Sequence, residues 1–320
     1  MRMNTLKVLD ALDREPNAGT GGQLDLRKEK RPLSVGRVAT YMVLLLYAVW
    51  ILAPFFIILV TSFTSAAEYE NAMSFIWWPK EFSFEGYQRL FTNKTFDVDG
   101  VPMLVRGFIN TMWITLLPLV SGLMQSLLVA YCYWQCKFPF KNSLFMFTVM
   151  LMFIPLSAFS FVGYMFYDNL GWTEGWQSVL PLVVPGLFAS ASTVFFLRPY
   201  LDGISGEIVE AAKIDGMNFI QIFFTIVLPL SKPALVAQFI FGFVSGYNNY
   251  AGALTYLLDE KKLWTIQLAV QQSVNYMSDG EFDYAFKCAT SLMSMLPLII
   301  VYLCCQKFFI EGISFGGGKE

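Results

Sequence analysis

Histidine is absent from the 320 residues of this chain. Its absence excludes a Ser-His-Asp or Cys-His nucleophilic arrangement and any zinc site with a histidine ligand. The acidic residues lie mainly between the apolar stretches, and nothing in their spacing pairs two of them as a general acid and a general base. We therefore expect no catalytic residues, no metal site and no enzymatic activity in this chain.

Cysteine is scarce, with five residues in all. The number is odd, and each cysteine lies in or at the end of an apolar stretch, where cysteine is commonly a small apolar filler. These cysteines indicate neither a disulfide framework nor an all-cysteine zinc site: Cys132, Cys136, Cys288, Cys304 and Cys305.

A phosphate-binding loop is also missing. Glycines gather near the end of the sequence, from Gly312 to Gly318, and Lys319 follows them. Their spacing does not fit G-x-x-x-x-G-K-[ST], no strand precedes them and no helix follows them. We expect this chain to bind no cofactor and no ATP.

Charged residues are also scarce, and apolar residues are abundant. Only 14% of residues are charged, 56% are hydrophobic and the mean hydropathy is +0.52, which is more apolar surface than one soluble core can bury. A helix needs about 20 predominantly apolar residues to cross a bilayer. Charge-poor windows of this length predict an all-α membrane protein with six transmembrane helices, at Val38–Ala67, Gly107–Cys136, Asn142–Tyr167, Gly175–Leu197, Pro233–Leu258 and Cys288–Gln306.

The lysines and arginines predict the orientation of these helices. Most of the 22 basic residues fall in the first 37 residues and in the loops on the same side of the membrane. Cytoplasmic loops carry such an excess, so we expect both termini and the segment 199–233 to be cytoplasmic. The chain then divides into a mobile leader (1–37), a six-helix domain (38–310) and a cytoplasmic tail (311–320).

The segment 199–233 is a polar island between two membrane-length apolar stretches. Glu210, Ala211 and Ala212 fall in a short predicted helix whose exposed face is small, so the surface of another protein can approach its backbone closely. A plain connector between two helices would explain the polarity of the segment, but it would not require two alanines beside an acid.

The rest of the island predicts a turn and a second helix. Gly216 supplies a turn without steric cost. Asn218, three residues before Gln221, predicts an N-cap with its reciprocal partner. Pro229 and Pro233 end this helix and begin the next apolar span.

This island resembles the EAA loop of ABC-importer permeases, the cytoplasmic segment by which the ATPase grips the permease. The resemblance implies a coupling role for six residues: Glu210, Ala211, Ala212, Asp215, Gly216 and Pro229.

The resemblance covers most of the chain from about Val38 onward. It is similar to the second permease of carbohydrate-uptake ABC importers, with short motifs in the family's order: Ile76-Trp77-Trp78-Pro79-Lys80, Phe108-Ile109-Asn110-Thr111 and Lys137-Phe138-Pro139-Phe140. It implies a plasma-membrane location, a second permease subunit, two ATPase subunits that bind ATP and Mg²⁺, an external solute-binding protein and a sugar substrate. No nucleic acid is implied.

The fifth apolar window departs from the family and carries most of the predicted substrate path. Relatives usually have Trp-Asn-Asp there, whereas this chain has Tyr247-Asn248-Asn249-Tyr250. Amides inside a membrane are costly when unpaired, so we expect Asn248 and Asn249 to face a cavity or a neighbouring helix. Gln125 in the second window is a further candidate. Ordinary hydrogen bonding between helices is the alternative for each.

Gly242-x-x-x-Gly246 precedes this cluster and allows close helix packing, either with a second permease or within the chain. Two other functions remain open: a permease of an ABC importer for a non-sugar solute, and a transporter or channel that needs no ATPase. The sequence shows no inverted repeat that would favour the latter.

Overall fold

The computed structural model describes residues 35–71, 76–92, 97–276 and 284–316. The chain divides into a smaller unit, Met1–Leu52, and a larger unit, Ala53–Glu320. Each unit is described by itself. Nearly all of the predicted leader, and residues 317–320 of the predicted tail, lie outside the described residues.

Helix α2 (Val35–Ser62) is the first apolar span, and most of its length belongs to the smaller unit. Apolar side chains occupy nearly all of its positions, so no face of the helix favours water. After Ser62 the amides of Phe63 and Thr64 donate to carbonyls three residues earlier, which tightens the last turn and ends the helix. The predicted span Val38–Ala67 is confirmed, with an earlier end.

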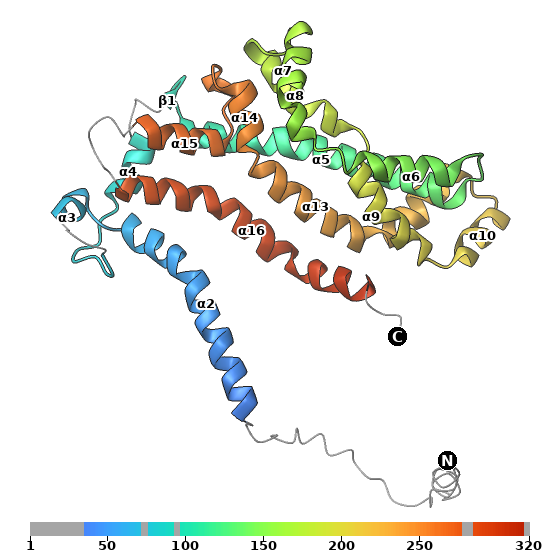
Figure 1. The fold of residues 1–320 in the computed structure, drawn as a ribbon, viewed down its shortest axis with the longest axis horizontal. Helices are drawn as coiled ribbons and strands as arrows, with labels where there is room; N and C mark the ends of the chain where they lie inside the picture. The colour runs from blue at the N-terminus through green and yellow to red at the C-terminus, as the bar shows by residue number, and fades with distance from the viewer. Residues whose placement is uncertain (1–34, 72–75, 93–96, 277–283, 317–320) are drawn as a thin grey trace, which may run out of the picture. The chain divides into compact units, whose positions relative to one another are not determined.

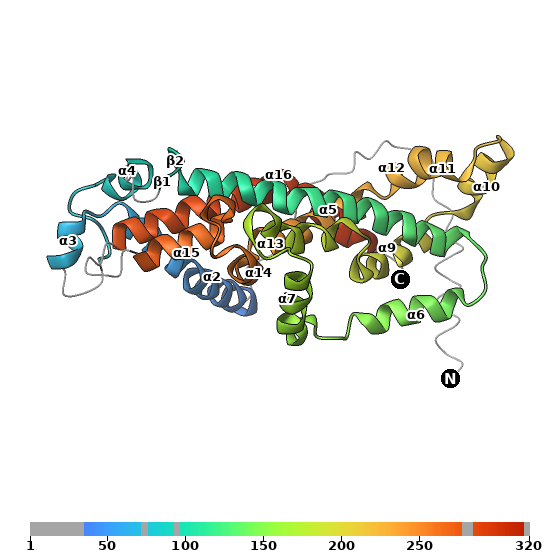
Figure 2. The same ribbon diagram turned by 90° about the horizontal axis from the view of Figure 1, so that it is seen from above.

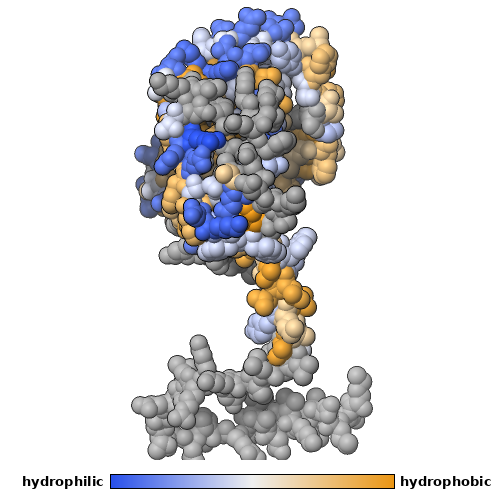
Figure 3. All heavy atoms as spheres, turned by 90° about the vertical axis from the view of Figure 1, so that its left-hand side faces the viewer, coloured by the Kyte–Doolittle hydropathy of each residue, from blue (hydrophilic) through white to orange (hydrophobic). Residues whose placement is uncertain are grey.

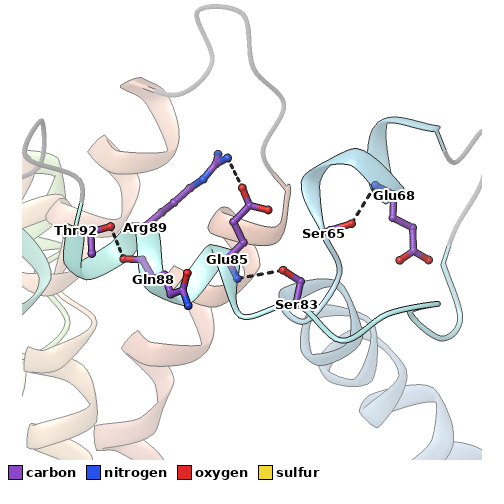
Figure 4. A network of polar contacts seen from close by, with 7 residues as sticks. All are labelled: Ser65, Glu68, Ser83, Glu85, Gln88, Arg89 and Thr92. Carbon is purple, nitrogen blue, oxygen red and sulfur yellow. Dashed lines mark hydrogen bonds and ion pairs between the residues drawn. The ribbon is translucent and has the colours of Figure 1, made fainter.

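Two short helices follow in the larger unit: α3 (Ala66–Asn71) and α4 (Glu85–Thr92). Side chains fix their first turns, because Ser65 Oγ accepts from the Glu68 amide (3.3 Å) and Ser83 Oγ accepts from the Glu85 amide (3.2 Å) (Figure 4). Arg89 pairs with Glu85 one turn along α4. These local contacts order the segment that precedes the second span.

A two-stranded hairpin leads into the second span, with β1 (Asp97–Val98) antiparallel to β2 (Val101–Pro102). Its turn residues Asp99 and Gly100 both have positive φ, as tight hairpin turns require. The Lys262 ammonium lies 2.9 Å from Asp99 Oδ2, and this hydrogen bond lowers the pKa of the Asp99 carboxyl. The contact is therefore present at neutral pH and is lost as pH falls through that lowered pKa.

Helix α5 (Met103–Gln135) is the second span and packs against α9, α13 and α15 (Figures 1 and 2). At 1.5 Å per residue its 33 residues extend about 50 Å, more than the thickness of the hydrocarbon core. The predicted span Gly107–Cys136 is confirmed.

The third predicted span, Asn142–Tyr167, is not one helix. It divides into α6 (Lys141–Leu151), the 3-10 helix η2 (Leu156–Phe159) and α7 (Ser160–Asn169). Pro155 has no amide hydrogen and disfavours helical geometry in the residue before it. The amides of Phe153 and Ile154 accordingly donate hydrogen bonds to carbonyls three residues earlier, and the first helix ends there.

The fourth span is assembled from short pieces. They are η3 (Gly175–Val179), α8 (Leu180–Val183), η4 (Pro185–Leu187) and α9 (Ala191–Asp202). Together Gly175–Asp202 is long and apolar enough to cross a membrane, which confirms the predicted Gly175–Leu197.

The polar island forms four short elements before the fifth span: α10 (Gly206–Ile214), α11 (Phe219–Ile222), the π-helix η5 (Phe223–Val227) and α12 (Leu228–Leu230). Helix α13 (Lys232–Tyr247) then leaves at 72° to the segment Phe219–Leu230. The predicted span Pro233–Leu258 is also broken, because α13 ends at Tyr247 and α14 (Tyr250–Leu257) begins after two asparagines.

In the part of the chain that the structure describes, three more elements follow: η6 (Lys261–Leu263), α15 (Ile266–Tyr276) and α16 (Tyr284–Gly316). Helix α4 packs closely on the start of α16, since a Cβ at Gly86 would lie 2.8 Å from the carbonyl oxygen of Ala285. The last predicted span is confirmed as Tyr284–Gln306. Helix α16 continues through Gly316, into the predicted tail.

Four helical segments of the described residues are long and apolar enough to cross a membrane, and the bent pair around Ser231 makes up to five. The six predicted spans are therefore not all present as continuous helices. The window that Pro155 interrupts contributes none of these candidate spans.

The larger unit has a core cluster toward each end. Leu257, Trp264, Leu268 and Phe286 belong to one cluster, and a second surrounds Tyr131 in the last turns of α5. The hairpin and α4 lie at the first end and α10 at the other (Figures 1 and 2). Figure 3 faces the first end, where hydrophilic residues gather.

Candidate functional site

Helix α10 carries the first group of predicted site residues. Ser205 precedes it in an extended conformation, and Glu207 in the first turn and Lys213 in the last turn complement the helix dipole. The chain leaves the helix through Gly216, whose φ of +83° suits glycine. The Met217 amide donates to the Ala212 carbonyl (3.0 Å) and closes the end of the helix.

The two alanines of α10 differ in burial. Val209 and Ala212 are buried in the core cluster around Tyr131. Glu210 and Ala211 are exposed, as is Pro229 further along the chain. The exposed face of α10 therefore offers one small side chain beside a carboxylate.

Ile214 adds an apolar end to this exposed face. Its side chain is 86% exposed, although isoleucine is among the residue types that are most often buried. Asp215 follows it as the C-cap of α10 and is exposed as well. Sequence reasoning missed Ile214. Its position directly after Lys213, in a polar segment, could have indicated that this apolar side chain is exposed.

The predicted capping box at Asn218 is confirmed. Asn218 Oδ1 accepts from the Gln221 amide (2.9 Å), and Gln221 Oε1 accepts from the Asn218 amide (2.8 Å). The ring of Phe219 stacks on Tyr131 of α5 with 4.3 Å between centroids. Lys213 Nζ donates to Gln135 Oε1 (3.2 Å), so both α10 and α11 are tied to the end of α5.

A cavity of about 660 Å³ lies between α5, the η4–α9 segment and α13. Its apolar lining includes Leu119, Phe188 and Phe241. Seven uncharged polar side chains complete it: Thr115, Ser190, Ser192, Thr193, Gln238, Ser245 and Asn249.

Asn249 is the one residue of the predicted substrate path that lines this cavity. It is also the N-cap of α14, where its Oδ1 accepts from the Gly252 amide (3.0 Å). Asn248 is exposed and ends α13. Its Nδ2 donates to the Val244 carbonyl (2.9 Å), and its Oδ1 accepts from Gln267 Nε2 (3.2 Å).

The other three predicted path residues lie away from the cavity lining. Tyr247 is buried and donates its hydroxyl to the Ser294 carbonyl (2.7 Å). Tyr250 packs against the core cluster at the hairpin end. Gln125 donates to the Leu187 carbonyl (2.6 Å) where η4 meets α5, and the same carbonyl accepts from Ser121 Oγ (2.8 Å).

Sequence reasoning missed Gln238 and Ser245 as lining residues. They are separated by two helical turns, and Gly242 and Asn249 continue the same face of the fifth window. This stripe of small and polar residues on one helix face is the sequence feature that could have identified them as lining residues. The start of α9 supplies Ser190, Ser192 and Thr193, and only the folded structure brings this segment against α5.

Gly242 and Gly246 are packed within the chain. A Cβ at Gly246 would lie 2.7 Å from Thr115 Cγ2 of α5, and one at Gly242 would clash with Leu119 Cδ1. Of the two predicted uses of this glycine pair, the structure supports packing between α13 and α5.

The sequence is similar to those of known proteins. Residues 122–313 match the family described as "Binding-protein-dependent transport system inner membrane component". The arabinooligosaccharides transport system permease protein AraQ of Bacillus subtilis is 27% identical over 89% of this chain and 97% of its own length. The sn-glycerol-3-phosphate transport system permease protein UgpE of Pectobacterium atrosepticum is 29% identical over 66% of this chain and 72% of its own.

A solved structure supports the fold. A chain of a bacterial ABC transporter involved in the import of the acidic polysaccharide alginate superposes with a TM-score of 0.74 at 21% identity, over 87% of this chain and 100% of that one. The family match includes most of the cavity lining, α10 and the bend before α13, and it covers more than half of the sequence. The chain therefore belongs to the family of binding-protein-dependent transport system inner membrane components.

Proposed function

We propose that this chain is one permease subunit of an ATP-driven sugar importer and that α10 is the helix by which ATPase subunits move it. The observation that carries this proposal is the pairing of a buried Ala212 with an exposed Ala211 beside Glu210. One alanine lets α10 lie close to the permease core, and the other lets a groove of the ATPase close on its outer side.

The contacts around α10 provide a path for this movement. Val209 and Ala212 join α10 to the cluster that includes Tyr131, and Phe219 stacks on the same ring. A displacement of α10 is thereby delivered to the inner end of α5, which lines the cavity farther along its length.

The topology that fits this role has six crossings. Helices α6 and α7 share the third crossing on either side of the break at Pro155, and the segment 199–233 and both termini are cytoplasmic. The positive-inside distribution of basic residues supports this orientation. The position of α10 at the end of the larger unit opposite the hairpin supports it as well.

The proposed partners are a second permease subunit, two ATPase subunits that bind ATP and Mg²⁺, and an external solute-binding protein. The cavity of this chain supplies half of the translocation pathway. The sugar class rests on relatives such as AraQ and the melibiose/raffinose/stachyose import permease protein MelC of Bacillus subtilis, which is 28% identical over 83% of this chain. The similarity to UgpE makes a non-sugar solute the second candidate substrate.

Uptake into proteoliposomes tests the proposal. The chain is reconstituted with its second permease and ATPase subunits, and uptake of labelled oligosaccharides is measured with and without ATP inside and the binding protein outside. We expect uptake only when both are present. Uptake of equal rate without ATP would instead establish a transporter that needs no ATPase.

A further inference from the structure

The cavity lining combines uncharged hydrogen-bonding groups with apolar ring faces. Its polar side chains are hydroxyls and amides, and no residue among the described lining is ionisable. Phe188 and Phe241 contribute aromatic surface and are 62% and 56% exposed. Sugars present hydroxyl groups together with apolar ring faces, so both kinds of surface have a counterpart in such a solute.

Part of the polar lining is available to a ligand. Gln238, Ser245 and Thr193 make no side-chain hydrogen bond with any other residue that the structure describes. Gln238 and Ser245 lie on one face of α13, two turns apart, and Thr193 faces the same cavity from α9. These groups can replace water around a polyhydroxy solute.

Three basic side chains on the elements that surround the cavity or adjoin them are engaged elsewhere. The Arg198 guanidinium lies over the Phe145 ring, 4.0 Å from its centroid. Lys262 and Arg106 both approach Asp99 at the hairpin. An anionic solute in the cavity would lose its hydration without gaining a positive partner from the described lining, and that desolvation is unfavourable.

We propose that this cavity selects uncharged polyhydroxy solutes, so that the transported compound is a neutral sugar and acidic saccharides are rejected. The inference rests on the proposed function and narrows its substrate class. It sets this chain apart from the importer of acidic alginate that shares its fold.

Thiol labelling of the full-length chain in membranes tests the selectivity of the cavity. Ser245→Cys is introduced after the five native cysteines are replaced, and Ser205→Cys on the exposed surface is the reference. Each thiol reacts with neutral 2-hydroxyethyl methanethiosulfonate and with anionic 2-sulfonatoethyl methanethiosulfonate. We expect the ratio of the anionic to the neutral rate to be about tenfold lower at position 245 than at position 205.

A second substitution separates charge from access. Gln238→Lys adds a cation two turns from position 245 and should raise the anionic rate there several-fold, whereas Gln238→Met, of similar length, should leave it unchanged. Equal rate ratios at positions 245 and 205, or an anionic rate that does not respond to Gln238→Lys, would overturn the inference.

Transport by the assembled importer distinguishes the inference from the function on which it rests. ATP-driven uptake of a neutral galactose disaccharide should exceed that of digalacturonate. Uptake of digalacturonate at an equal or higher rate, still driven by ATP, would contradict selection for neutral solutes and leave the importer standing. Loss of ATP dependence would contradict the importer itself, whichever solute moves.

Discussion

Two neighbouring residues of α10 have opposite surroundings, and this difference is open to a stability test. Ala212 is 4% exposed in the cluster with Tyr131, whereas Ala211 is exposed. Ala212→Leu should destabilise the chain by about 1 to 3 kcal/mol because it overpacks a tight contact. Ala211→Leu adds the same atoms on the open side and should change the stability little.

Thermal unfolding in detergent measures this difference. The midpoint for Ala212→Leu should fall below that of the unsubstituted chain, while the midpoint for Ala211→Leu stays with it. Equal losses for the two variants would mean that both alanines are buried, and α10 would then have no open small face to offer.

Residue chemistry that acts within one turn was readable from the sequence. The capping box at Asn218 and Gln221 and the turn at Gly216 depend only on neighbours within a few positions, and both are present. The surroundings of Tyr247 and Gln125 were not readable, because their partners, Ser294 and Leu187, are distant in the sequence.

At the level of elements, close packing against α5 organises the cavity. A Cβ at Gly122 would lie 2.7 Å from the Gly186 carbonyl oxygen and 3.1 Å from that of Phe188. Both are backbone atoms, so they cannot turn aside as a flexible side chain can. Gly122→Ala should therefore separate α5 from η4, lower the unfolding temperature and reduce transport, with a cost of about 1 to 3 kcal/mol.

Gly163→Ala is the matched control. Gly163 lies inside α7 and has no atom within 4 Å of the position of an added Cβ. Alanine is favoured over glycine inside a helix by about 1 kcal/mol, so this variant should keep or slightly raise the unfolding temperature. A Gly122→Ala variant as stable as Gly163→Ala would show that the contact between α5 and η4 is not tight.

Apolar windows predicted a single continuous helix correctly only where one helix fills the window. They located α2, α5 and α16, but a count of apolar residues cannot show that Pro155 interrupts a window. The break between α13 and α14 was missed for a related reason. Asn248 and Asn249 were interpreted as polar residues inside a helix, whereas they cap the ends of two helices.

For the molecule as a whole, the orientation in the membrane decides whether α10 can meet an ATPase. Ser205 lies directly before α10, and Glu174 is exposed between α7 and η3. In a chain freed of native cysteines, an impermeant maleimide should label Ser205→Cys only from the cytoplasmic side and Glu174→Cys only from outside. Labelling of both from the same side would contradict six crossings with a cytoplasmic α10.

The central claim is that an ATPase closes on the exposed face of α10, and Ala211→Trp tests it most directly. ATP-driven uptake and its stimulation by the loaded binding protein are measured in proteoliposomes, with Ala158→Trp, at an exposed alanine of η2, as the control. We expect Ala211→Trp to insert and to pair with the second permease, yet to lose uptake by about tenfold or more, because a bulky ring overpacks the closing groove. Ala158→Trp should transport normally. Uptake and ATPase stimulation by Ala211→Trp at the level of the unsubstituted importer would contradict the account.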